Sequence, residues 1–142
     1  MKKNRFHIYF YTVMRLLIIP YFKYVAQHSW ESCKPESDPA LILTNHNTNW
    51  DFFYFGLTFP RQMYFVASEH IYRLGPVSKI IKFLVEPIPR KKGAPASDTA
   101  RMIKERLDRG HNVCMMAEGN RSFNGETGFI SPRTAALVKD CG

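Results

Sequence analysis

The pattern of hydrophobic positions divides the chain into two unlike parts. Residues 6–25 form an apolar stretch rich in aromatic side chains, whereas from residue 40 onward short apolar runs alternate with longer segments. Three of the short runs have the length and composition of buried strands: residues 41–44, 62–66 and 112–116. The polar residues 29–39 between the two parts include two prolines, which is typical of a linker.

Helices are predicted between these strands. In the clearest one, Ser97 or Asp98 caps the N-terminus, Gly110 follows the C-terminus, and three apolar residues share one face: Ala100, Ile103 and Leu107. Three further helices are predicted, at residues 50–59, 77–84 and 132–140. Alternating strands and helices predict an α/β fold with a mostly parallel or mixed sheet flanked by helices, and ligand chemistry at the strand ends.

The N-terminal stretch is better suited to lying on a membrane than to crossing it. Arg15, Pro20 and Lys23 interrupt the apolar run, and aromatic residues mixed with cations are typical of the headgroup level of a bilayer. An aromatic-rich core helix is the alternative. The predicted organisation is a membrane-associated helical segment at residues 1–28, a linker at 29–39 and a folded domain at 40–142.

Charge and cysteine content narrow the possible partners and location. The chain of 142 residues has a formal net charge of +8, which favours an anionic partner: nucleic acid, an anionic membrane face or a phosphorylated substrate. Its three cysteines form neither a C-x-x-C metal pair nor a disulfide framework, so a reducing, cytosol-facing location fits best.

The first polar cluster, residues 45–51, directly follows a predicted strand. On a regular helix His46 and Asp51 would point roughly 140° apart, so they can meet only if His46 lies in a turn before the helix. Asp51 would then hold one imidazole nitrogen protonated and leave the other to act as a general base. The alternatives are a helix cap with a structural histidine and a metal site, although the i, i+4 histidine pair of zincins is missing.

The second polar cluster follows the predicted strand at residues 112–116. Glu118, Gly119, Asn120, Arg121 and Ser122 begin a glycine-rich loop in which an arginine, a hydroxyl and backbone N–H groups could grip a phosphate. Glu118 could restrain Arg121 or accept a hydroxyl. The alternative is a surface turn with a solvated arginine.

A third group, residues 85–93, is an extended, proline-fixed piece that carries three consecutive cations, the first of them Arg90. Its alternative interpretation is a solvated charge run.

Together, His46-x-x-x-x-Asp51 and the loop from Glu118 to Ser122 resemble the signature of the glycerolipid acyltransferases, specifically the 1-acylglycerol-3-phosphate acyltransferase branch. The resemblance covers residues 40–142 and includes Arg90 as counterpart of the arginine between the two motifs. It implies that His46 deprotonates a glycerol hydroxyl, that Asp51 orients His46, and that the substrate is bound by six residues: Arg90, Glu118, Gly119, Asn120, Arg121 and Ser122. Asn120 stands where many members have threonine.

The resemblance also implies substrates and a location. A fatty acyl group would pass from coenzyme A, acyl carrier protein or an acyl phosphate to lysophosphatidic acid, giving phosphatidic acid, with no cofactor or metal. The protein would be peripheral or monotopic at the cell membrane, with membrane lipid as its partner and its active site facing the cytoplasm. Because such enzymes continue through a further strand and a proline-containing motif, residues 40–142 are expected to be an incomplete, N-terminal part of the domain.

Two other functions compete with this interpretation. A basic nucleic-acid-binding module would explain the charge and aromatics, but no RNA- or DNA-binding motif is recognisable and many aromatics lie in the N-terminal run. A thiol enzyme would use Cys114 as acyl carrier and His46 as base. Cys114 lies among apolar residues of a predicted strand, where a thiol is usually inert packing.

Overall fold

The computed structural model describes residues 5–27, 29–31, 39–48, 50–90, 96–119, 121–122 and 126–141. In chain order its elements are α1 (Arg5–Pro20), a π-helical turn η1 (Tyr21–Val25), β1 (Leu41–Thr44), α2 (Asp51–Thr58), β2 (Met63–Ser68), a 3-10 helix η2 (Glu69–Arg73), α3 (Pro76–Val85), β3 (Ile88–Arg90), α4 (Ala96–Asp108), β4 (Asn112–Met116) and α5 (Pro132–Cys141).

The four strands form one sheet in the order β1-β4-β2-β3, and every neighbouring pair is parallel. Thr44 at the end of β1 lies opposite Met116 at the end of β4, and Ser68 at the end of β2 lies opposite Arg90 at the end of β3. The predicted α/β class with a parallel sheet is confirmed. Because the strands are parallel, their C-terminal ends lie on the same side of the sheet, and the segments that follow the strands all leave from that side.

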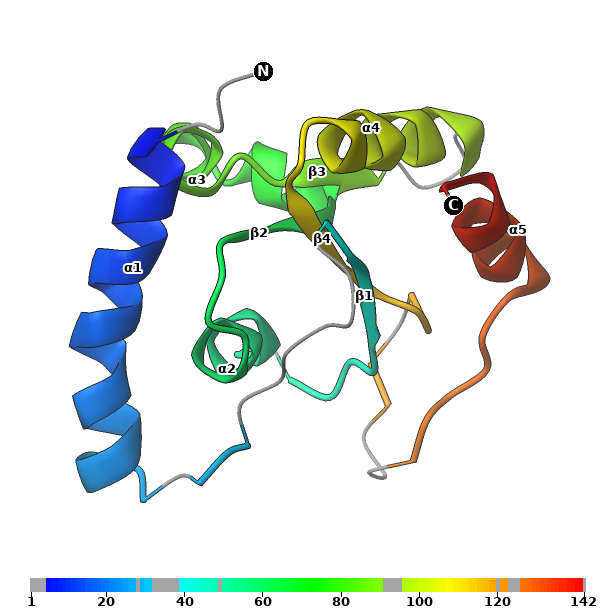
Figure 1. Cartoon of the computed structure of the whole chain (residues 1–142). Coiled ribbons are helices and arrows are strands. Elements are labelled where there is room, and N and C mark those ends of the chain that lie inside the picture. Colours follow the sequence, from blue (N-terminus) through cyan, green and yellow to red (C-terminus); the bar gives the residue numbers. More distant parts are fainter. Residues whose placement is uncertain are drawn as a thin grey trace.

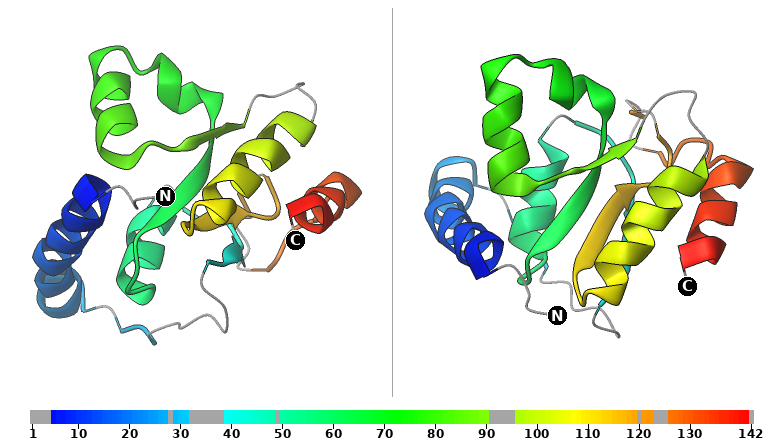
Figure 2. Two further views of the ribbon diagram at one scale, coloured as in Figure 1. Left: turned by 45° about the horizontal axis from the view of Figure 1, so that its top comes forward. Right: turned by 90° about the horizontal axis from the view of Figure 1, so that it is seen from above.

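Helices cover both faces of the sheet (Figures 1 and 2). Alternate strand residues point to opposite faces, so Tyr64 and Val113 pack with Ile103 of α4 and Leu137 of α5. On the other face, Phe65 and Cys114 pack with side chains of α2 and α1, among them Phe52 and Tyr11. The central strands β2 and β4 therefore have two buried faces, which is why they read as continuous apolar runs in the sequence. The run at 41–44 was also predicted to be a buried strand, but β1 lies at the edge of the sheet and leaves Leu43 exposed.

The predicted helices are all present, most with boundaries shifted by one residue. The predicted N-cap at Ser97 or Asp98 is wrong, because α4 already begins at Ala96 and both residues lie in its first turn. Gly110 has a φ of 77° and follows α4, where its N–H donates to the carbonyl of Leu107 at 2.7 Å, as expected of a C-terminal cap. The predicted strand at 62–66 begins one residue later and continues to Ser68. It is longer because Ala67 and Ser68 pair with Pro89 and Arg90 of β3.

Two elements, the strand β3 and the helix η2, were not predicted from the sequence. Pro89 cannot donate a backbone hydrogen bond, which disfavours a strand inside a sheet. In this fold β3 is at the edge of the sheet, where one side needs no partner.

Helix α1 packs against the domain through one side only. His7 is buried, with Nδ1 3.1 Å from the hydroxyl of Tyr64 and Nε2 3.0 Å from the carbonyl oxygen of Phe83. Tyr11 donates a hydrogen bond to the carbonyl of Phe59 at 2.8 Å. In the part of the chain that the structure describes, every helix is too short or too polar to span a bilayer. Residues 32–38 of the predicted linker lie outside the described residues.

Candidate active site

His46 and Asp51 lie close together just beyond the C-terminal end of β1. Helix α2 begins at Asp51, so His46 lies in the turn before the helix, as the spacing required. Its Nδ1 is 2.7 Å from Oδ2 of Asp51. An ionised carboxylate can only accept hydrogen bonds, so Nδ1 carries the proton and Nε2 of the neutral ring keeps its lone pair.

The same turn holds the Asp51 carboxylate with several other donors. The N–H of Asn47 donates at 2.8 Å, the N–H of Thr48 at 3.1 Å and the hydroxyl of Thr48 at 2.8 Å. Burial raises the pKa of the Asp51 carboxyl, but the hydrogen bonds from His46, Thr48 and Asn47 outweigh burial and hold this pKa below its ordinary value of 3.8. Asp51 therefore remains an anion that fixes the orientation of the His46 ring.

Exposure of the pair is unequal in a way that suits proton transfer. The side chain of Asp51 is 8% exposed, whereas that of His46 is 20% exposed. The carboxylate is thus shielded while part of the imidazole remains open to a ligand.

The loop after β4 is joined to this turn through the backbone. The N–H of Ala117 donates to the carbonyl of Thr44 at 2.9 Å and extends the pairing of β4 with β1. Farther along, the N–H of Ser122 donates to the carbonyl of His46 at 2.9 Å. The two polar clusters that the sequence analysis singled out are therefore neighbours in space.

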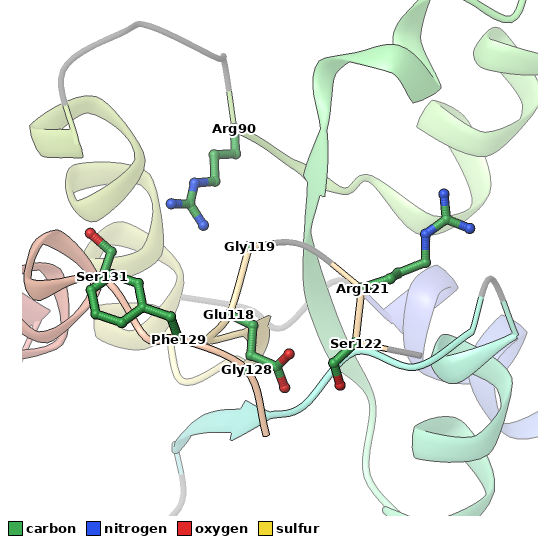
Figure 3. A pocket seen from close by; sticks show the side chains of 8 residues that line it. All are labelled: Arg90, Glu118, Gly119, Arg121, Ser122, Gly128, Phe129 and Ser131. Carbon is green, nitrogen blue, oxygen red and sulfur yellow. The ribbon is translucent and has the colours of Figure 1, made fainter. Parts of the chain in front are cut away.

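An open pocket of about 360 Å³ lies beside this junction (Figure 3). Five of the six predicted substrate-binding residues line it: Arg90, Glu118, Gly119, Arg121 and Ser122. The sixth, Asn120, lies outside the described residues. His46 and Asp51 are not among its lining residues, and Ser122 connects them to it.

Three further residues line the pocket and were not predicted individually: Gly128, Phe129 and Ser131. Gly128 belongs to the glycine-rich loop that the sequence analysis noted. Phe129 and Ser131 belong to no recognisable sequence motif. The path of the chain between this loop and α5 brings them to the pocket, and a local sequence pattern does not reveal that path.

The two arginines approach the pocket differently. Gly119 has a φ of 70°, and a Cβ at this position would be 3.4 Å from Nη1 of Arg90, so the guanidinium lies over the glycine backbone. In Figure 3, Arg90 points toward Gly119 while Arg121 points away from Arg90. Both side chains line the pocket, but they do not converge on one point in this conformation.

Glu118 is a buried carboxylate at the pocket, only 9% exposed. Its Oε1 is inaccessible to solvent and has no hydrogen-bond partner among the described residues. Its Oε2 faces Gly128, where a Cβ would be 2.9 Å away. Because buried polar atoms are normally paired, this oxygen is a candidate acceptor for a group that arrives with a ligand.

Cys114 is buried in the centre of β4, on the face covered by α1 and α2. Burial raises the pKa of its thiol to about 12, although the neighbouring Thr44 hydroxyl acts in the opposite direction. A thiol that stays protonated is a poor nucleophile, which argues against the thiol-enzyme alternative.

We therefore expect Cys114→Ala to keep acyl transfer within about twofold of wild type, while losing about 1 kcal/mol of stability because it leaves a small cavity. Initial rates and urea unfolding measure the two effects. Loss of transfer in a folded Cys114→Ala protein would instead support a covalent acyl-thiol intermediate.

The alternative of a metal site has no structural support: among the described residues, no group of three His, Cys, Asp or Glu side chains could hold a metal ion.

A parallel α/β sheet that brings a histidine–carboxylate pair beside an arginine-lined pocket defines a site suited to activating a hydroxyl near an anionic group. Residues 25–141 match the model of the acyltransferase family, and the chain belongs to this family. No curated protein and no solved structure matches the chain. The enzyme class predicted from the two motifs is confirmed, and the nucleic-acid-binding alternative loses its support.

Proposed function

We propose that this acyltransferase transfers a fatty acyl group from an acyl carrier thioester to the free hydroxyl of lysophosphatidic acid, giving phosphatidic acid. The observation that carries the proposal is the 2.7 Å contact between His46 Nδ1 and Asp51 Oδ2, beside a pocket lined by Arg90 and Arg121. The pair supplies a base for a hydroxyl, and the arginines supply the charge for a neighbouring phosphate.

In the proposed reaction, Nε2 of His46 takes the proton of the acceptor hydroxyl while the hydroxyl oxygen attacks the carbonyl carbon of the thioester. The carbon–sulfur bond then breaks, and the leaving thiolate receives the proton from the imidazolium. Asp51 stabilises the imidazolium between these steps. Acyl-coenzyme A and acyl carrier protein both offer this thioester; an acyl phosphate would replace the thiolate with phosphate as leaving group.

The pocket provides the groups that an acceptor phosphate needs. Arg90 and Arg121 are suited to charge-assisted hydrogen bonds with phosphate oxygens, and Ser122 contributes a hydroxyl. The buried Oε1 of Glu118 would accept a hydrogen bond from an arginine that turns inward with the ligand, and so hold it in place.

We expect Arg121→Ala and Arg90→Ala each to raise the KM for lysophosphatidic acid by about ten- to a hundredfold, since each removes a charge-assisted contact worth about 1.5–3 kcal/mol. The KM for the acyl donor should change little. Initial rates at varied acceptor concentration measure the effect, with Arg101→Ala, an exposed arginine of α4, as the matched control.

A second acceptor sharpens this test. Monoacylglycerol has the acyl chain and the glycerol hydroxyls but no phosphate, so the wild-type enzyme should discriminate strongly against it. The arginine variants should lose most of that discrimination. An unchanged preference for the phosphorylated acceptor in both variants would refute the phosphate role of the pocket.

The proposed location is the cytoplasmic face of the cell membrane, with the protein bound peripherally or monotopically. In support, the side of α1 that faces away from the domain exposes four apolar or aromatic residues: Tyr9, Val13, Leu16 and Leu17. Such a stripe fits a helix lying at a bilayer interface, close to its lipid substrate.

A further inference from the structure

Helix α3 has an apolar face that nothing in the described part of the chain covers. None of its residues is buried, and Val77, Ile80 and Phe83 are all exposed, Ile80 by 57% and Phe83 by 67%. Their spacing of three residues places them along one side of the helix. Leu74, just before α3, is exposed as well.

The exposed side of α3 is continuous with that of α1. The rings of Phe6 and Phe83 are 5.2 Å apart, and both are exposed. Beneath them, Nε2 of His7 donates a hydrogen bond to the carbonyl of Phe83, so the two helices are also joined through a buried contact. Figures 1 and 2 show α1 and α3 at the same end of the molecule, with α5 at the opposite end.

The charged side chains within these two helices have one sign, although Glu86, which directly follows α3, carries a carboxylate paired with Arg106. Residues 5–25 and 74–85 contain no aspartate or glutamate. Their exposed cations include Arg5, Lys23, Lys79 and Lys82. Apolar and aromatic residues interspersed with cations complement an anionic phospholipid surface, because the rings enter the acyl boundary while the cations remain among the headgroups.

We propose that α1 and α3 form one composite bilayer-binding face, in which α3 is a second membrane contact in addition to the N-terminal helix. Only Glu86 and Pro87 separate α3 from β3, whose last residue, Arg90, lines the pocket. Seating α3 on the bilayer therefore positions the strand that carries a pocket arginine. The inference concerns binding to anionic lipid and does not depend on the identity of the acyl acceptor.

Flotation of the full chain with phosphatidylcholine vesicles, with and without phosphatidylglycerol, tests the proposal in the absence of acyl donor and acceptor. The wild-type protein should bind the phosphatidylglycerol vesicles, and added salt should weaken this binding. The double variant Ile80→Glu with Phe83→Glu should bind at least about tenfold more weakly, since two apolar side chains no longer enter the bilayer. The matched control is Ala135→Glu with Ala136→Glu, which adds the same charge to exposed positions of α5.

A gain-of-binding variant protects the test against misfolding. Val77→Trp should bind severalfold more tightly than wild type, because tryptophan favours the interface, and a damaged fold would not produce this gain. The Lys79→Gln and Lys82→Gln double variant should lose most of the preference for phosphatidylglycerol while still binding through its apolar face.

Two results would overturn the inference. One is wild-type binding by the Ile80→Glu and Phe83→Glu variant, which would leave α1 as sole anchor. The other is a wild-type chain that ignores vesicles but dimerises in solution, with dimerisation abolished by the same variant, which would make a second copy the occupant of this face. His46→Ala should bind vesicles normally, so failure of the proposed chemistry is separable from failure of the bilayer face.

Discussion

Replacing His46 with alanine is expected to lower kcat for acyl transfer by about a hundred- to ten-thousandfold, the range that general-base catalysis contributes. The acceptor hydroxyl would lose the Nε2 lone pair that takes its proton, while acceptor binding through the arginine-lined pocket would persist. Thiol release from the acyl donor, followed with lysophosphatidic acid as acceptor, measures the effect.

The matched control for this variant is His70→Ala, which removes an exposed imidazole on η2. Its rate should equal that of wild type, and the circular dichroism of both variants should show an intact fold. A folded His46→Ala protein with near-normal turnover would exclude His46 as the base.

Asp51→Asn should reduce both catalysis and stability. Asparagine cannot accept through its amide nitrogen, so His46 Nδ1 would lose its fixed acceptor and the ring could adopt the wrong tautomer, at a cost of up to about ten-thousandfold in kcat. The N–H groups of Asn47 and Thr48 would lose part of the carboxylate that satisfies them. We expect a loss of about 1–3 kcal/mol in the free energy of unfolding, measured with urea.

The pH dependence of that loss follows from the direction of the pKa shift. The pKa of Asp51 is lower in the folded protein than its ordinary value of 3.8. The contribution of the ionised carboxylate to the free energy of unfolding is therefore fully present when the pH is above 3.8. This contribution is lost as the pH falls below 3.8 through the folded pKa. The stability difference between wild type and Asp51→Asn should therefore be constant near neutral pH and shrink below about pH 4.

The exposed Asp108→Asn at the end of α4 is the control and should change the free energy of unfolding by less than about 0.5 kcal/mol. A stability difference for Asp51→Asn that persisted unchanged into strong acid would show that the carboxylate charge is not what the turn requires.

The family and the His46–Asp51 geometry could both be predicted because they depend on short stretches of sequence. The two residues are five positions apart, and a turn containing Asn47 and Thr48 suffices to fold one toward the other. The Asn- and Thr-rich helix cap that competed with the catalytic interpretation is not observed, since the N-cap of α2 is Trp50, which makes no side-chain cap hydrogen bond. The Thr48 hydroxyl instead accepts from the N–H of Trp50 at 3.1 Å within the turn before the helix. One turn therefore both starts α2 and holds the imidazole.

The sheet also follows largely from the sequence. The runs at 41–44 and 112–116 became β1 and β4 with the predicted bounds. The run of β4 is uniformly apolar because both faces of this strand are buried, whereas β1 is an edge strand that leaves Leu43 exposed. The exception is β3, whose proline is acceptable only at an edge. Edge position is a property of strand order, which short-range patterns do not encode.

The sequence by itself determined most of the helices and strands, the enzyme family and the local His46–Asp51 turn, because each depends on short stretches of neighbouring residues. Only the tertiary structure decided that β1 lies next to β4, which brings Ser122 to the backbone of His46 and joins base and pocket. It likewise decided which side of α1 is buried, since both sides are apolar and the side with His7 and Tyr11 finds polar partners in the domain. These outcomes depend on contacts between residues far apart in the chain. The free energies of such contacts cannot be deduced from a local sequence pattern.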